Sequence, residues 1–221
     1  VPVMVGSGSN CTATQIEKSI GYQNMGADAL LLIAPYYNKA NPEGMYRHFA
    51  ETADKVQIPC ILYNVPGRTG CSIPVSVVER LSRHPNIAGI KEASGDMSYA
   101  MKIARCVGPD FALYSGNDDI TVPLMSVGGS GVISVYANVM PAMCHQIVAD
   151  FLGGNQAQAV ANHLKYLQLM NDLFMEVNPI PVKTAMNLLG LNVGPMRLPL
   201  CEMSEEHAAA LRRTMEEAGL L

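Results

Sequence analysis

The stretch "NIAGIKEASGD", residues 86–96, places a lysine directly after a short apolar segment. Residues 87–90 predict a buried β-strand, residues 92–95 predict a turn, and Asp96 is a typical N-cap for a following helix. Lys91 therefore stands at the end of a buried strand and not on a solvated helix face. Burying an ammonium group is costly unless it is paired or gives up its proton. A lysine at this position therefore suggests that its amine has a chemical function.

The same alternation of strand and helix extends outward from this stretch in both directions. Short apolar segments occur at residues 2–5, 29–33, 59–62, 87–90, 111–114 and 131–135. Amphipathic segments lie between and after them, at residues 12–25, 42–56, 74–83, 97–107, 118–127 and 139–152. This order predicts a parallel sheet covered by helices. The strands are apolar at every position, so we expect them to be buried on both faces.

The pattern changes after residues 153–154, a Gly-Gly pair, to helices alone at 155–174, 179–189 and 204–218. We therefore predict a catalytic partial (β/α) barrel over residues 1–154 and a C-terminal helical domain over residues 155–221. A closed barrel needs eight βα units. An open doubly wound sheet would carry GxGxxG after a strand, and "VGSGSN" at residues 5–10 lacks the third glycine. We expect a (β/α)8 TIM barrel, truncated at its N-terminal side to about six units, in a chain that opens in mid-fold.

The composition limits the classes of partner. The net charge is −4, and no block of basic residues is present, which argues against nucleic-acid binding. The apolar runs are too short to cross a bilayer, which argues against membrane insertion. The six cysteines show no metal-ligand spacing, and a disulfide framework is unusual in a chain of 221 residues. We expect reduced cysteines, no metal, and a cytoplasmic location.

A short set of candidate site residues follows the strands at what would be the carboxyl edge of the sheet, where α/β barrels place their active sites. They are Tyr36, Tyr37, Tyr63, Arg68, Lys91, Ser115, Gly116, Ile133 and Ser134. A lysine beside phenols, with no cluster of carboxylates or histidines, suggests covalent catalysis through a Schiff base without a cofactor. Desolvation would lower the lysine pKa, and a phenol could relay protons. An arginine could hold a carboxylate in bidentate fashion, so the set suits an α-keto acid.

Each of these residues also has a plainer interpretation. Lys91 could extend its ammonium group to solvent along an apolar stem. The tyrosines could simply fill the mouth of a barrel, and Arg68 could form a surface ion pair. The functional hypothesis depends on their occurrence together at successive strand ends.

Longer motifs of this sequence resemble the dihydrodipicolinate synthase family, within the N-acetylneuraminate lyase superfamily. They are "LLIAPYYNKANPEGMYRHF" (31–49), "ILYNVPGRTG" (61–70), "GIKEASGD" (89–96), "GGSGVISV" (128–135) and "NPIPVK" (178–183). The resemblance implies a homotetrameric (β/α)8-barrel lyase, a dimer of dimers. It implies that the lyase condenses pyruvate with L-aspartate 4-semialdehyde to give 4-hydroxy-tetrahydrodipicolinate, in the diaminopimelate route to lysine.

The resemblance also assigns roles to individual residues. Lys91 matches the lysine that forms the Schiff base with pyruvate, and Tyr63 matches the tyrosine that shuttles protons to the substrate. Tyr37 matches the tyrosine that a neighbouring subunit inserts into the proton relay. Arg68 matches the arginine that holds the carboxylate of the semialdehyde. Ile133 matches a backbone position that lines the pyruvate pocket, and Gly116 is expected close to it.

Two positions depart from the family pattern. The "GTTGE" stretch, which supplies a threonine to the relay, is absent because the chain starts at the third strand of the barrel. Asn10 and Tyr36 match positions of a possible allosteric lysine site, but Thr14 stands where lysine-inhibited members carry a glutamate, which predicts weak inhibition.

Two alternatives to the synthase stay open. One is a related class I pyruvate lyase or aldolase acting on N-acetylneuraminate or a keto-deoxy-sugar acid, which Arg68 disfavours. The other is an inactive fragment of the synthase.

Overall fold

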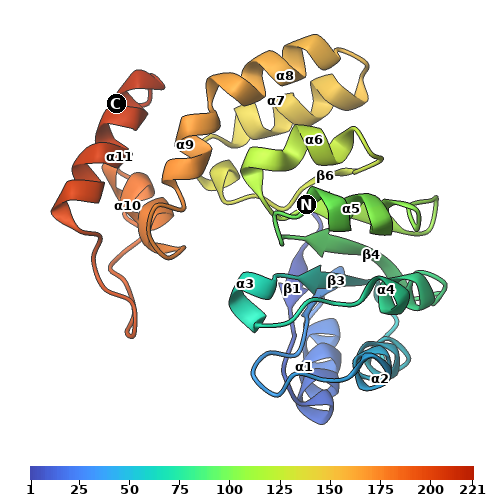
Figure 1. The fold of residues 1–221 in the computed structure, drawn as a ribbon. Coiled ribbons are helices and arrows are strands. Elements are labelled where there is room, and N and C mark those ends of the chain that lie inside the picture. Colours follow the sequence, from blue (N-terminus) through green and yellow to red (C-terminus); the bar gives the residue numbers. More distant parts are fainter. The chain divides into compact units, whose positions relative to one another are not determined.

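The computed structural model describes residues 1–221 and divides into two compact units (Figure 1). The first comprises residues 1–117 and 123–133, and the second comprises residues 118–122 and 134–221. By compactness, residues 134–154 thus group with the C-terminal helices, although the sequence pattern placed them with the strands. A boundary between functional domains after residue 154 stays a prediction.

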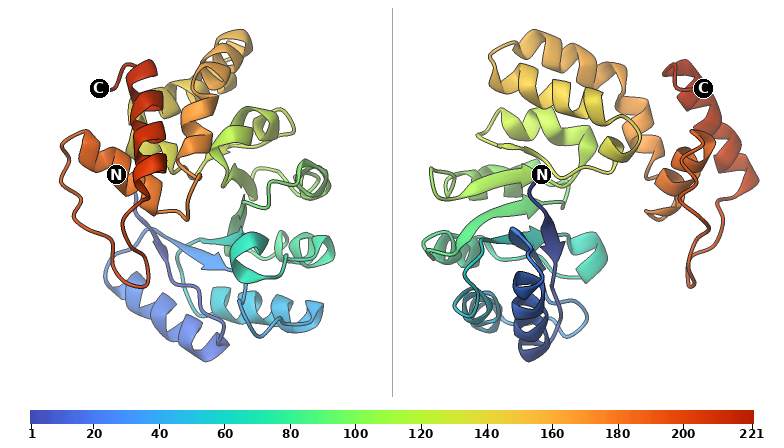
Figure 2. Two further views of the ribbon diagram at one scale, coloured as in Figure 1. Left: turned by 60° about the vertical axis from the view of Figure 1, so that its left-hand side comes forward. Right: turned by 180° about the vertical axis from the view of Figure 1, so that it is seen from behind.

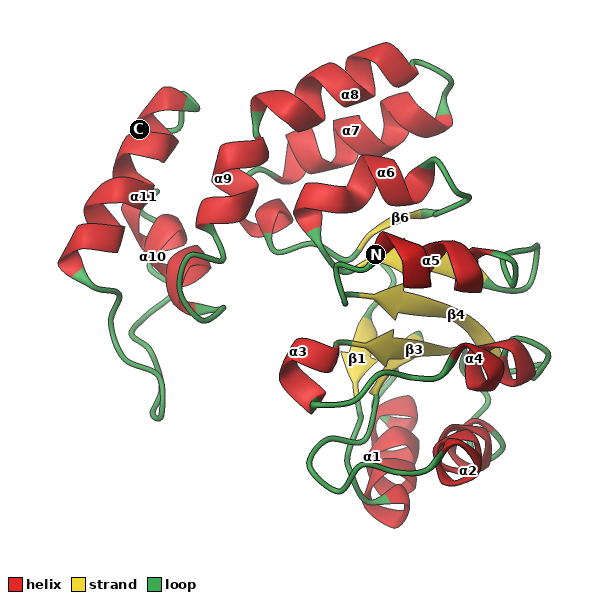
Figure 3. Cartoon of the chain, viewed as in Figure 1, coloured by secondary structure: helices red, strands yellow, loops and turns green.

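The first unit contains a six-stranded parallel sheet whose strands follow one another in chain order. The strands are β1 (Met4–Gly6), β2 (Ala29–Ile33), β3 (Cys60–Asn64), β4 (Ile87–Glu92), β5 (Ala112–Ser115) and β6 (Gly131–Val132). The sheet curls like half of a barrel, with helices along its convex side (Figures 2 and 3). The prediction of parallel βα units is confirmed, and all six predicted strands are present, the strand at 29–33 with the predicted bounds and the other five with at least one shifted end.

The connecting helices of this unit begin where the sequence provides caps. They are α1 (Thr12–Asn24), α2 (Pro42–Ala53), α4 (Val75–Leu81) and α5 (Met97–Ala104). The side chain of Asn41 accepts from the backbone N–H of Gly44 at 2.8 Å and caps α2. Asp96 accepts from the N–H of Tyr99 at 3.1 Å and caps α5 as predicted.

Two short helices complete the strand connections. Helix α6 (Thr121–Met125) lies within residues 118–127, where the sequence predicted a longer helix. Helix α3 (Pro66–Thr69) was not predicted, because the sequence analysis treated residues 64–70 as a loop. Proline at its first position and a left-handed Gly70 at its end, with φ of 72°, give it typical helix boundaries.

The core of the first unit lies between the convex face of the sheet and its helices. Leu30, Leu32, Leu62 and Leu113 have no exposed surface and belong to one cluster with Phe49 of α2. Alternate positions of the strands point the other way and are half-buried, as the pattern in β2 shows. The expectation of strands buried on both faces was therefore wrong for these positions, because the helices of this unit pack on the convex face.

The second unit is helical. It contains two 3₁₀ turns, η1 (Asp118–Ile120) and η2 (Tyr136–Asn138), and the helices α7 (Pro141–Leu152), α8 (Gln156–Lys165), α9 (Leu167–Asp172), α10 (Ile180–Leu188) and α11 (Glu205–Glu217). The single helix predicted over 155–174 is broken at Tyr166, whose ψ of 9° departs from helical geometry. The Tyr166 ring is buried and lies 6.3 Å from the ring of Tyr136. None of the helices is long and apolar enough to cross a membrane.

We predict that Gly89→Ala destabilises the sheet. A Cβ atom at Gly89 would lie 2.5 Å from the backbone oxygen of Ala112 in β5, so the two strands would have to separate. We expect a loss of about 1–3 kcal/mol in the free energy of unfolding, measured by denaturant titration.

The matched control for this substitution is Gly108→Ala, since a Cβ atom there would meet nothing within 4 Å. Equal stability losses in the two variants would contradict the close approach of β4 and β5.

Candidate active site

The pairing register of the strands brings Tyr63 and Lys91 together at the carboxyl edge of the sheet. Tyr63 pairs with Lys91, and Lys91 pairs in turn with Tyr114 of β5. Residues in register lie on the same face of a sheet, so these three side chains share the concave face. Tyr114 was not singled out from the sequence, because it was taken as part of the apolar strand. Tyr114 could have been recognised as a candidate site residue because it stands near the end of the predicted strand, directly before Ser115.

The lysine and the tyrosine are in contact. The Lys91 Nζ atom lies 4.4 Å from the centre of the Tyr63 ring, and both side chains are half-buried. Burial raises the pKa of the Tyr63 phenol, while the positive charge of Arg68 acts in the opposite direction. A neutral phenol beside an amine is suited to giving and receiving a proton during addition to a carbonyl group.

Arg68 is carried to this edge by the short helix α3. Pro66 and Gly70 fix the two ends of the helix, and Arg68 occupies its last turn with an exposed side chain. Its positive charge lowers the pKa of the Tyr63 phenol and so partly offsets the effect of burial. A guanidinium group in this position can recognise a carboxylate of a molecule bound beside Lys91.

Gly116 leaves the space that the Lys91 side chain uses. A Cβ atom at Gly116 would lie 2.9 Å from Lys91 Cε and 2.5 Å from Ala93 Cβ. The Gly116 N–H donates to the backbone oxygen of Glu92 at 2.7 Å. The Ile133 N–H donates to the backbone oxygen of Ser115 at 2.8 Å, so Ile133 extends the same edge. The predicted neighbours Gly116 and Ile133 thus both join the edge that carries Lys91.

Tyr37 is not brought to Lys91 within this chain. Its ring is 90% exposed, and its backbone has a positive φ of 70°, which is uncommon for a residue with a side chain. The neighbouring pair Asn10 and Tyr36 does come together, since Asn10 Nδ2 donates to the backbone oxygen of Tyr36 at 3.2 Å. Asn38 Nδ2 donates to the backbone oxygen of Asn10 at 2.9 Å and closes this second cluster.

Behind Tyr63 and Lys91, two polar residues that the sequence analysis missed form a buried pair. Asn64 and Glu92 are in register, and they directly follow Tyr63 and Lys91 respectively. Asn64 Nδ2 donates to Glu92 Oε2 at 2.7 Å. Burial raises the pKa of Glu92, and the hydrogen bonds from Ser94 and Asn64 oppose that effect. The signal in the sequence was a carboxylate and an amide directly after the strand-end residues.

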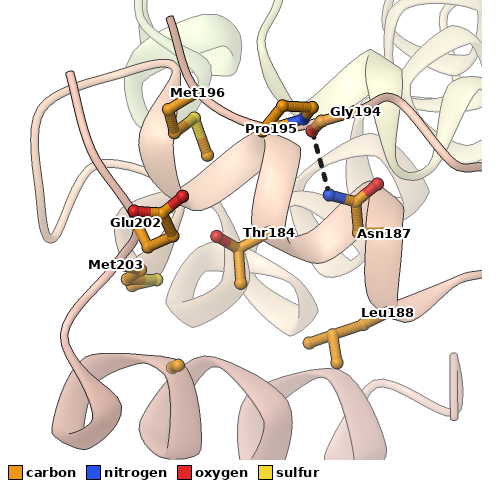
Figure 4. A pocket seen from close by; sticks show the side chains of 9 residues that line it. Thr184, Asn187, Leu188, Gly194, Pro195, Met196, Glu202 and Met203 are labelled. Carbon is orange, nitrogen blue, oxygen red and sulfur yellow. Dashed lines mark hydrogen bonds between the residues drawn. The ribbon is translucent and has the colours of Figure 1, made fainter. Parts of the chain in front are cut away.

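A separate cavity of about 330 Å³ lies in the helical unit and contains none of the predicted site residues. Met196, Met203 and Leu188 line it, and Asn187 Nδ2 donates to the backbone oxygen of Gly194 at 3.3 Å across one side (Figure 4). In the whole chain, no group of three or more His, Cys, Asp or Glu side chains is arranged to hold a metal ion.

Comparison with known proteins identifies the family. The family described as "Dihydrodipicolinate synthetase family" matches residues 1–218. The 4-hydroxy-tetrahydrodipicolinate synthase of Thermoanaerobacter sp. (strain X514) is 50% identical over 222 residues, which cover all of this chain and 75% of that protein. The chain belongs to the dihydrodipicolinate synthetase family. The relatives it matches are named 4-hydroxy-tetrahydrodipicolinate synthase, which is a lyase.

Solved structures of the family have the same fold. Dihydrodipicolinate synthase of Thermotoga maritima matches with a TM-score of 0.97 at 38% identity, covering all of this chain and 76% of that one. The chloride-inhibited enzyme of Acinetobacter baumannii, solved in complex with pyruvate, matches with a TM-score of 0.96 at 40% identity and the same coverage. The chain thus spans about three quarters of the length of these relatives.

We predict that Arg68→Ala raises the pKa of Tyr63 further above its ordinary value. The arginine charge favours the phenolate, so its removal leaves the effect of burial unopposed. The pKa is measured from tyrosinate absorbance during an alkaline titration, as the difference from the same titration of a Tyr63→Phe variant.

Arg68→Lys is the control in this titration, because it keeps the charge and should leave the Tyr63 pKa near that of the unchanged chain. An identical Tyr63 pKa with arginine and with alanine at position 68 would show that the guanidinium group does not act on the phenol.

Proposed function

We propose that this chain condenses pyruvate with L-aspartate 4-semialdehyde to give 4-hydroxy-tetrahydrodipicolinate, in the diaminopimelate route to lysine. The observation that carries the proposal is the contact of Lys91 Nζ with the Tyr63 ring at the carboxyl edge of the sheet. Membership of the synthetase family and relatives named for this reaction support it. The pyruvate complex of the Acinetobacter baumannii enzyme supports pyruvate as the first substrate.

In this proposal Lys91 is the nucleophile. Its unprotonated amine adds to the keto carbon of pyruvate, and the resulting carbinolamine loses water to form an imine. The imine loses a methyl proton to give an enamine, which forms a carbon–carbon bond to the aldehyde carbon of the semialdehyde. The amine of the semialdehyde then attacks the imine carbon, which closes the ring and releases Lys91.

Tyr63 and Arg68 have complementary roles in the same scheme. Tyr63 moves protons to and from the carbinolamine, because its ring lies against the lysine and burial raises the pKa of its phenol, which favours the protonated form. Arg68 binds the carboxylate of the semialdehyde, a group that the sugar aldehydes joined to pyruvate in N-acetylneuraminate or a keto-deoxy-sugar acid do not have. Gly116 leaves room for the lysine, and Ile133 lines the pyruvate pocket.

The assembly belongs to the proposal as well. We propose a homotetramer, a dimer of dimers, in which Tyr37 enters the proton relay of a neighbouring subunit. Its 90% exposed ring and its strained backbone support a partner outside its own chain. We further propose a (β/α)8-type catalytic domain followed by a helical domain, and a cytoplasmic location in keeping with a biosynthetic role.

We predict that borohydride reduction in the presence of pyruvate attaches the three-carbon acid to Lys91 alone. Peptide mass spectrometry of the full chain locates the adduct. Lys91→Arg keeps the positive charge but has no primary amine, so it should give no adduct and no turnover.

The same experiment separates the rivals. An adduct on Lys91 together with turnover of L-aspartate 4-semialdehyde, and none of N-acetylneuraminate, supports the synthase. Turnover of the sugar acid would favour the related lyase, and a folded chain without an adduct would favour the inactive fragment.

We also predict that Thr14→Glu increases inhibition by L-lysine. The position stands on α1, four residues after Asn10, which contacts Tyr36, and a carboxylate there would attract a cationic amino acid. The inhibition constant for L-lysine is measured against the unchanged chain. Thr14→Gln is the neutral control, and equal inhibition of the glutamine and glutamate variants would argue against a charge effect.

A further inference from the structure

The side chains of Asn64 and Glu92 form a hydrogen-bond chain with a fixed direction. The Ile73 N–H donates to Asn64 Oδ1 at 2.9 Å, and Asn64 Nδ2 donates to Glu92 Oε2 at 2.7 Å. The Ser94 N–H donates to the other carboxylate oxygen, Glu92 Oε1, at 2.6 Å. Asn64 has no exposed surface, and Glu92 is 1% exposed. The two bonds of Asn64 are buried and the bond from Ser94 is partly buried, so leaving one unmade is costly.

The direction follows from the two backbone groups at its ends. A backbone N–H can only donate, so the Ile73 amide requires the oxygen of the Asn64 side chain to face it. The nitrogen of that side chain then faces Glu92 as a second donor. Glu92 accepts from Asn64 on one oxygen and from Ser94 on the other, an arrangement that suits a carboxylate, which can only accept. These hydrogen bonds favour the charged form of Glu92 and oppose the effect of burial, which raises the pKa of its carboxyl group.

The pair connects the segments that carry the proposed reactive groups. Asn64 directly follows Tyr63, and Glu92 directly follows Lys91, so their bond fixes the two strands against each other at that level. Through Ile73, Asn64 also holds the segment that follows the helix of Arg68.

A second path closes the network through α5. The Tyr99 hydroxyl donates to the backbone oxygen of Ile73 at 2.6 Å. The Tyr99 N–H in turn donates to the Asp96 cap, two residues beyond Ser94. The β4–α5 turn and the segment after α3 are therefore tied to each other as well as to the strand ends.

We propose that Asn64 and Glu92 are positioning residues, which hold Lys91, Tyr63 and the helix of Arg68 in their reactive arrangement through one directional hydrogen-bond chain. This inference rests on the proposed function for its catalytic consequence. It goes beyond that function by assigning two buried residues that touch no substrate.

The direction of the hydrogen-bond chain predicts how substitutions combine. Glu92→Gln places an amide nitrogen against one of two fixed donors, and Asn64→Asp places two carboxylates 2.7 Å apart. The double variant N64D/E92Q restores these three bonds. The new carboxylate at position 64 accepts from the Ile73 N–H and from the new amide nitrogen at position 92, whose amide oxygen accepts from the Ser94 N–H. Each single substitution should therefore disrupt the hydrogen-bond chain, and the two substitutions together should restore it.

The test measures the rate at which pyruvate and borohydride label Lys91 in the full chain. We expect Glu92→Gln and Asn64→Asp each to slow labelling by about 10- to 100-fold, since a misplacement near 1 Å has effects of that size. The double variant should recover most of the rate. A labelling rate of Glu92→Gln equal to that of the unchanged chain, or no recovery in the double variant, would overturn the proposal.

A matched control separates positioning from stability. Asn86 precedes the opposite end of β4, where its side-chain nitrogen donates to the backbone oxygens of Ala53 and Val56 at 3.0 and 2.9 Å. Asn86→Asp breaks hydrogen bonds of a partly buried asparagine away from Lys91. It should lower the thermal midpoint while slowing labelling much less than Glu92→Gln. Equal slowing at equal loss of stability would also overturn the proposal.

Amide hydrogen exchange of Ile73 and Ser94 provides a readout that does not need catalysis. Both amides should exchange slowly in the unchanged chain, quickly in Glu92→Gln, and slowly again in N64D/E92Q. Absence of labelling in the unchanged chain would count against the proposed function, and this exchange pattern would still decide on the network. Equal exchange rates of these two amides in all three proteins would overturn the proposed hydrogen-bond chain.

Discussion

The register between β3 and β4 is the constraint on which the candidate site depends. It sets Tyr63 opposite Lys91 on the concave face and Asn64 opposite Glu92 on the face turned toward the helices. Because side chains alternate along a strand, a shift by one residue would exchange these two layers. The ammonium group would then enter the helix-covered core, and the buried carboxylate would face the open side. The register of these two strands thus places Tyr63 and Lys91 on one face of the sheet and Asn64 and Glu92 on the other.

Much of this arrangement could be predicted from the sequence, since apolar runs of strand length and their caps are local signals. The strand at 29–33, the strand predicted at 87–90 that extends to Glu92, and the cap at Asp96 all carry such signals. The nearness of Lys91 and Tyr63 also followed, because parallel strands end at one edge. The helix break at Tyr166 could not be predicted, since it accompanies packing on Tyr136, which is distant in sequence.

The supporting pair was missed for a related physical reason. A glutamate and an asparagine after a strand are common in turns, where both face solvent. Only the three-dimensional contacts reveal that Glu92 accepts from Asn64 and from Ser94 while shielded from water. The role of a buried polar residue depends on its hydrogen-bond partners, and Asn64 lies on a different strand from Glu92. Lys91 and Tyr63 could be singled out from the sequence because a lysine and a tyrosine at strand ends are unusual. Asn64 and Glu92 could not, because their residue types are common at such positions.

The space at Gly116 has a consequence for how the sequence can change over time. A methyl group at residue 116 and the methyl group of Ala93 would occupy nearly the same volume, with Cβ atoms 2.5 Å apart. The two positions can share one methyl group but cannot both carry one without movement of the backbone. Moving it from residue 93 to residue 116 would still press on Lys91 Cε, 2.9 Å away. These two positions should therefore vary together across related sequences, and the lysine decides which of the two arrangements persists.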